Sequence, residues 1–109
     1  PARQGEKAAD VLLVSWGSSE GAVSEAASLL REKGTKASSL HFSQVWPLAP
    51  ESFMDCLQSA RRVVCVEGNA TGQFARLLRR ETGFHIENLI LRYDGLPFTP
   101  EYIVKRLAP

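Results

Sequence analysis

Two apolar segments, each followed by a glycine-rich loop and then a helical pattern, constrain the fold of this chain most strongly. Residues 11–14 read Val-Leu-Leu-Val and residues 63–66 read Val-Val-Cys-Val, without the polar alternation of a strand that has one face in water. Continuous apolar runs of this kind are typical of strands buried on both faces. The sequence therefore predicts two central strands of a parallel sheet, over residues 11–16 and 62–67.

Weaker patterns supply the other elements. A strand is expected over 35–42, near an edge because the polar His41 lies between Leu40 and Phe42, and a fourth strand over 89–91 with Tyr93. Apolar residues at helical spacing predict helices over 22–33, from Pro50, over 73–82 and from Thr99. Strands that alternate with helices predict a three-layer α/β/α fold with a mostly parallel sheet of four or five strands and the core order 2-1-3-4.

Length and charge narrow the class of protein. The 109 residues suffice for one domain, and 13 Lys and Arg against 12 Asp and Glu give no basic surface that would indicate nucleic acid or an anionic membrane. No apolar run approaches the roughly 20 residues of a membrane span, and the first ten residues lack the apolar centre of a signal peptide. We expect a cytoplasmic domain over 10–109, a linker or tag remnant over 1–9, and a longer parent chain. Cys56 and Cys65 have no metal or redox spacing and are expected to be buried thiols.

The expected strand order places two loops together. In open α/β sheets, ligands bind beyond the carboxyl ends of the strands where the winding direction reverses, here between the two central strands. The loops at that point are residues 17–21, Gly-Ser-Ser-Glu-Gly, and residues 68–72, Gly-Asn-Ala-Thr-Gly. Any functional site is expected there.

The first loop satisfies the G-x-S-x-G pattern of a nucleophile elbow, which suggests a minimal serine hydrolase with Ser19 as nucleophile. A serine needs a histidine base that a carboxylate orients. Asp55 or Glu67 followed by His85 has a suitable chain order, but His85 precedes the fourth strand and so lies at the opposite end of the sheet. The alternative is a tight turn in which Ser18 or Ser19 caps the next helix.

The second loop could hold a phosphate or carboxylate on its backbone N–H groups, which suggests a small-anion binding module, although no nucleotide fingerprint is present. A turn with a helix cap is the alternative. Glu67 ends a buried strand and needs a partner, from Asn69, Gln73 or a neighbouring chain. The remaining prominent side chains have structural interpretations: a solvated helix face for Arg76, Arg79 and Arg80, and packing at strand and turn ends for Trp16, Trp46 and Phe98.

Four segments together resemble one family. They are Val14 to Ser18 with Gly21 and Glu25, Leu40 to Pro47 (LHFSQVWP), Val64 to Gln73 (VCVEGNATGQ) and Arg92 to Pro100 (RYDGLPFTP). In this order and spacing they resemble the transketolase C-terminal-like domain of the α subunit of 2-oxoacid:ferredoxin oxidoreductases, most closely the 2-oxoglutarate type. The resemblance covers about residues 10–105.

The resemblance implies a holoenzyme that oxidatively decarboxylates a 2-oxoacid, forms an acyl-CoA and reduces ferredoxin, using thiamine diphosphate, Mg²⁺ and an iron–sulfur cluster held in other domains or on the β subunit. It implies that this domain is a non-catalytic scaffold, without a cofactor of its own, whose partners are the other α-subunit domain and the β subunit. The residues carried over as contacts with those partners are Trp16, Gly17, Ser18, Ser19, Glu67, Asn69, Thr71, Gly72 and Gln73.

Overall fold

The computed structural model describes residues 1–43, 48–68, 71–92 and 96–107. Within them lies one mixed sheet with the strand order β1-β3-β2-β4-β5. The strands are β1 (Ala2–Gln4), β2 (Val11–Trp16), β3 (Ala37–Phe42), β4 (Arg62–Glu67) and β5 (Asn88–Leu91). β2, β3, β4 and β5 are parallel, and β1 alone runs antiparallel to its neighbour. The predicted order 2-1-3-4 is confirmed as β3-β2-β4-β5.

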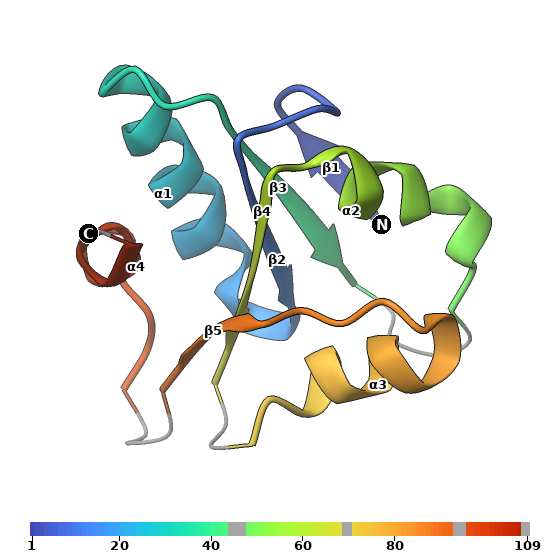
Figure 1. Ribbon diagram of the computed structural model, residues 1–109. Helices are drawn as coiled ribbons and strands as arrows, with labels where there is room; N and C mark the ends of the chain where they lie inside the picture. Colours follow the sequence, from blue (N-terminus) through green and yellow to red (C-terminus); the bar gives the residue numbers. More distant parts are fainter. Residues whose placement is uncertain (44–47, 69–70, 93–95, 108–109) are drawn as a thin grey trace.

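Helices cover both faces of the sheet, which confirms the three layers (Figure 1). The helices are α1 (Glu20–Glu32), α2 (Met54–Ser59), α3 (Gln73–Thr82) and α4 (Pro100–Leu107), with 3-10 turns at Gly17–Ser19 and Pro50–Ser52. α1 and α4 pack with Leu13, Val64 and Ile90 on one face. α2 and α3 pack with residues of the opposite pleat, such as Leu12 and Cys65, on the other. None of the helices within the described residues is long and apolar enough to cross a membrane.

Side chains alternate between the two faces of the central strands, and both faces are buried. On the α3 side, Phe42 is the centre of an aromatic group, with ring centroids 4.9 Å from those of Phe53 and Phe74. Cys56 and Cys65 are both buried and free, as predicted. Trp46 and Tyr93, which the sequence analysis also assigned to packing and to the fourth strand, lie outside the described residues.

The first residues differ from the expected linker. Ala2–Gln4 form β1, whose Ala2 lies opposite His41 and whose Gln4 lies opposite Ser39. All six residues of β3 are buried, including its polar side chains. The three residues of β1 are all exposed and show no apolar alternation, so the sequence gives no sign of a strand there. Backbone hydrogen bonds to β3, which do not depend on the side chains, hold β1 in place.

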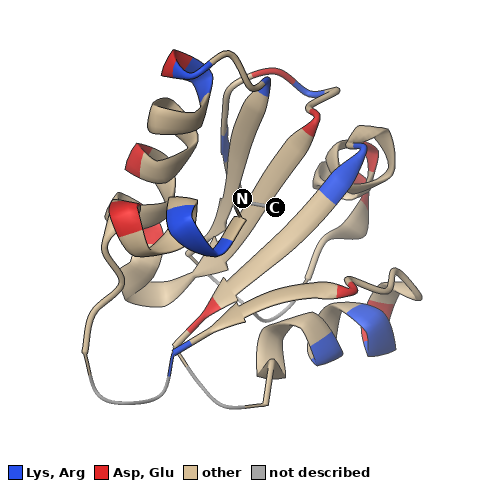
Figure 2. Ribbon diagram, turned by 60° about the vertical axis from the view of Figure 1, so that its left-hand side comes forward, with Lys and Arg blue, Asp and Glu red and all other residues tan. Residues whose placement is uncertain are grey.

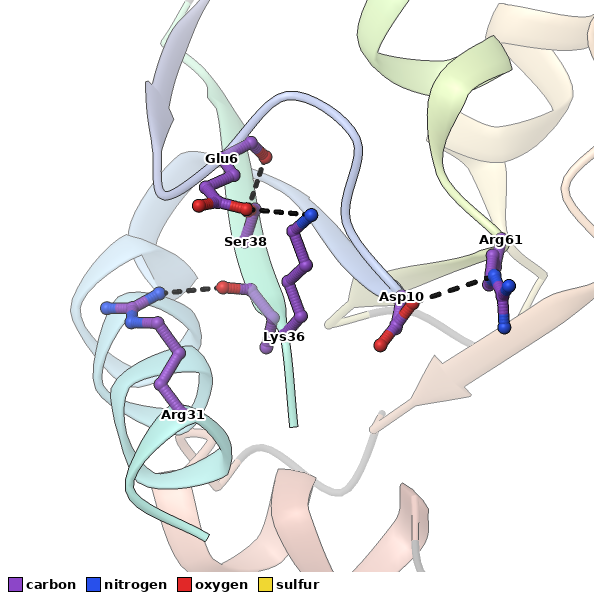
Figure 3. Close-up of polar contacts among 7 residues, drawn as sticks. Glu6, Asp10, Arg31, Lys36, Ser38 and Arg61 are labelled. Atoms are coloured by element: carbon purple, nitrogen blue, oxygen red, sulfur yellow. Dashed lines mark hydrogen bonds and ion pairs between the residues drawn. The ribbon is translucent and has the colours of Figure 1, made fainter. Parts of the chain in front are cut away.

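Polar contacts fix the segment between β1 and β2 (Figure 3). Ser38 Oγ donates to the Glu6 carbonyl at 2.6 Å, and Lys36 Nζ lies 2.8 Å from Glu6 Oε2. The hydrogen bond and the charge of Glu6 raise the pKa of Lys36. Asp10 lies 3.7 Å from Arg61. Because these ion pairs are exposed, they contribute little to stability.

Candidate functional site

A cavity of about 820 Å³ opens at the carboxyl ends of β2, β4 and β5, where the sequence analysis expects a site. Three parts of the chain line it: the start of α1, the start of α3 with the end of β4, and the segment that follows β5. The lining residues are Trp16, Gly17, Ser18, Ser19, Gly21, Ala22, Gly68, Gln73, Arg92, Leu96, Pro97 and Phe98. We call this cavity the crevice.

The loop after β2 forms one wall of the crevice. Gly17, with φ +73°, begins a 3-10 turn that leads directly into α1. Ser19 occupies the cap position of α1 without a capping side-chain bond, and its hydroxyl donates to the Trp16 carbonyl at 3.3 Å. The expected capping role is therefore wrong for Ser19, because its hydroxyl turns back toward the preceding turn.

Glu67 ends β4 beneath the crevice and is 1% exposed. Its Oε1 accepts a hydrogen bond from the backbone N–H of Phe74 at 2.6 Å, and its Oε2 accepts one from Ala75 at 3.0 Å. These amides belong to the first turn of α3, whose N–H groups have no partner within the helix. The structure thus gives Glu67 two partners that the sequence analysis did not name, both at the start of α3.

Two further groups contact the Glu67 carboxylate. The indole Nε1 of Trp16 donates to Oε1 at 3.4 Å, and the thiol of Cys65 donates to Oε2 at 3.4 Å. Burial raises the pKa of the Cys65 thiol, and the charge of Glu67 and its hydrogen bond raise it further. The Glu67 carboxylate therefore connects Trp16, in the wall of the crevice, with the start of α3.

The residues proposed as contacts divide into four groups. Trp16, Gly17, Ser18, Ser19 and Gln73 line the crevice. Glu67 and Gly72 are buried next to it and Thr71 is exposed, while Asn69 lies outside the described residues.

Sequence reasoning missed the third wall of the crevice, formed by Arg92 and residues 96–98. The guanidinium of Arg92 lies 4.4 Å from the centroid of the Tyr102 ring, which in turn contacts Phe98 with ring centroids 5.9 Å apart. β5 is parallel to β4, so its carboxyl end lies at the same edge of the sheet. That rule of strand direction, applied to the fourth strand, would have found this wall.

The serine hydrolase alternative does not match the geometry. His85 precedes β5 and therefore lies at the amino end of the sheet, away from Ser19 in the crevice. His41 bonds instead with Ser15, whose Oγ lies 2.8 Å from Nδ1 across the β2–β3 register. Ser15 is fully buried, so a substrate cannot reach its hydroxyl.

The side chains that could bind a metal ion are not grouped together in the described part of the chain. No group of three or more His, Cys, Asp or Glu side chains comes together within the described residues. Cys56 and Cys65 lie on different elements, and burial favours the protonated form of Cys65, whereas a cluster ligand must be a thiolate. The described residues therefore do not offer the set of cysteine ligands that an iron–sulfur cluster needs.

Comparisons with known proteins agree with the resemblance. The chain is 39% identical over 95 residues to subunit α of 2-oxoacid:ferredoxin oxidoreductase 1 of Aeropyrum pernix, a match that covers 85% of this chain and 15% of that protein. It superposes with a TM-score of 0.89 and 33% identity on 2-oxoglutarate:ferredoxin oxidoreductase from Magnetococcus marinus, solved with 2-oxoglutarate, coenzyme A and succinyl-CoA bound, covering 97% of this chain and 18% of that one. The alpha chain of a probable 2-oxoacid ferredoxin oxidoreductase from Thermoplasma acidophilum gives a TM-score of 0.66 with 36% identity, covering 96% and 90% of the two chains.

The chain thus spans only about 15% of the curated relative from Aeropyrum pernix. The family described as "Transketolase, C-terminal domain" matches residues 2–99, which include all five strands and the three walls of the crevice. With this match over nine-tenths of its length and the mostly parallel sheet expected of such a domain, the chain belongs to the transketolase C-terminal domain family.

Proposed function

We propose that this chain is a non-catalytic scaffold domain of the α subunit of a 2-oxoacid:ferredoxin oxidoreductase, and that its crevice contacts the rest of that enzyme. The names of the matched proteins support the choice of enzyme. The observation that carries the proposal is the crevice itself, which is lined by the exposed Leu96 and the half-buried Trp16 and Phe98.

The whole enzyme would carry out CoA-dependent oxidative decarboxylation of a 2-oxoacid, with ferredoxin as electron acceptor. The bound molecules named for the Magnetococcus marinus enzyme support 2-oxoglutarate as the substrate. Thiamine diphosphate, Mg²⁺ and the iron–sulfur cluster would be held by other domains or by the β subunit. The complex would act in the cytoplasm.

The exposed apolar side chains at the crevice support a contact surface. Leu96 is 59% exposed. Phe98, on the same wall, and Trp16, on the wall formed by the loop after β2, are half-buried. An apolar group of this kind, surrounded by polar residues, commonly marks a protein interface. The other domain of the α subunit or the β subunit would cover it in the assembled enzyme.

Hydrogen exchange can test this proposal on the assembled enzyme. The full-length α subunit would be purified with its β subunit, and amide exchange of residues 16–22 and 96–98 compared before and after dissociation of the complex or removal of the other α-subunit domain. We expect strong protection of these segments in the complex and its loss on separation. Equal exchange in both states would contradict the scaffold proposal.

A small-anion binding module is the second candidate, because the crevice has a volume typical of ligand pockets. Titration of this chain with phosphate or a short carboxylic acid would separate the two. Saturable binding that persists in the assembled enzyme would favour the module, since a covered crevice has no room for the anion.

A further inference from the structure

The outer face of α3 carries a group of basic side chains that the proposed scaffold role does not yet use. Arg76, Arg79 and Arg80 are all exposed. Residues three and four apart lie next to each other on a helix, so the three guanidinium groups share one face. Figure 2 shows basic residues recurring along α3 at one flank of the sheet. We call these three residues the α3 basic face.

Acidic residues of the described chain compensate this charge only in part. Arg80 lies 3.4 Å from Glu81, while Arg76 and Arg79 form no ion pair within the described residues. The described residues form three other ion pairs, none of which involves α3. They are Lys7 with Asp55, Lys36 with Glu6 and Arg61 with Asp10.

The helix itself accounts for only two of the three arginines. Arg79 and Arg80 lie in the last turn of α3, where a positive charge interacts favourably with the helix dipole. Arg76 lies in the first turn, where a positive charge is unfavourable, and its neighbours one turn further on carry the same sign. The dipole of α3 therefore gives no reason for a cation at position 76.

We propose that the α3 basic face binds an acidic protein surface elsewhere in the same enzyme. The inference rests on the proposed scaffold function and extends its interface. Gln73, at the start of α3, lines the crevice, so the basic face continues directly from the apolar opening marked by Trp16 and Leu96. Arginine and aromatic side chains are the residues most enriched in protein interfaces.

Carboxylates on a protein surface suit this face better than a small anion. None of the three arginines lines the crevice, so they do not form part of a small-anion site there. Each guanidinium can instead bind its own carboxylate with two parallel hydrogen bonds. The net charge of +1 for the whole chain gives no support to a nucleic acid.

Arginine footprinting of the intact enzyme tests the proposal. The full-length α subunit in complex with its β subunit would be treated with phenylglyoxal, and modification of each arginine followed by mass spectrometry. Arg62 is the internal reference, because it is exposed at the amino end of β4. We expect Arg76 and Arg79 to react at least fivefold more slowly than Arg62, and the protection to weaken in high salt. Equal rates, or protection removed by nuclease treatment, would overturn the proposal.

Charge reversal gives an independent test with a matched control. The double variant R76E/R79E should lower the yield of assembled complex several-fold at low salt. The control R62E/K33E makes the same change in net charge at exposed positions of the opposite end of the sheet, and should assemble normally. Equal yields from the two double variants would contradict the proposal.

The two levels of inference can fail separately. If residues 16–22 are protected from exchange while Arg76 reacts as fast as Arg62, the scaffold function stands and the α3 interface is wrong. If Arg76 is protected while the crevice exchanges freely, the α3 interface stands and the crevice contact is wrong.

Discussion

The side chain of Glu67 caps a helix to which it does not belong: its Oε1 lies 2.6 Å from the backbone nitrogen of Phe74 in the first turn of α3. The residue in the usual cap position is Gly72, which has no side chain to accept such a bond. A carboxylate at this point also interacts favourably with the positive end of the helix dipole. The end of β4 thereby fixes where α3 begins.

Replacing Glu67 by Gln should lower the free energy of unfolding by about 1–3 kcal/mol, because one acceptor oxygen becomes an NH₂ group that faces a backbone N–H. Urea denaturation of the two proteins measures the difference. Glu101→Gln is the matched control, since Glu101 lies in the first turn of α4 but is exposed. This control should cost about 0.5 kcal/mol or less. Equal losses in the two variants would show that the carboxylate of Glu67 has no special structural role.

Gly72→Ala should cost about 1–2 kcal/mol, because Gly72 has φ +66° and a left-handed backbone is unfavourable for other residues. An added Cβ would also lie 2.9 Å from Leu89 Cδ1, but Leu89 is 38% exposed and can rotate away. Gly83→Ala isolates the backbone contribution, since Gly83 has φ +80° and open space around it. We expect similar losses in both variants by chemical denaturation. A much larger loss for Gly72→Ala, relieved by Leu89→Ala, would instead identify the side-chain contact as dominant.

The elements with strong apolar patterns were predictable from the sequence. α3 forms over Gln73–Thr82 as expected, because its apolar residues and the following glycine mark both the buried face and the end. The central strands β2 and β4 follow from their continuous apolar runs. β1 has no such pattern, since its three side chains are all exposed.

Two kinds of contact could not be predicted from the sequence: those that depend on the register between paired strands, and those that depend on where a helix packs against the sheet. The bond between Ser15 and His41 requires the alignment of β2 with β3, which no local pattern specifies. Glu67 was recognised as needing a partner, but its bonds to backbone amides follow only from the position of α3 above β4.

Ser19 should react with a fluorophosphonate probe no faster than an ordinary surface serine, because its hydroxyl donates to the Trp16 carbonyl and not to a histidine. Labelling followed by mass spectrometry measures this rate, with the exposed Ser43 as an internal reference. Ser15 should stay unlabelled in the folded protein despite its bond to His41, because it is fully buried. Rapid stoichiometric labelling that disappears in Ser19→Ala would support the hydrolase alternative.

The free energy of unfolding should fall as the pH rises above the ordinary pKa of a cysteine, about 8.5. Burial, together with the Glu67 carboxylate, raises the pKa of the Cys65 thiol in the folded protein, so the unfolded chain loses this proton first. Each pH unit above that value should therefore cost up to about 1.4 kcal/mol from this group, until the folded thiol also ionises. Cys65→Ser removes the titrating group but keeps a donor toward Glu67, so urea denaturation between pH 8 and 10 should show a shallower decline for this variant. Identical pH profiles would mean that Cys65 does not contribute to the loss of stability.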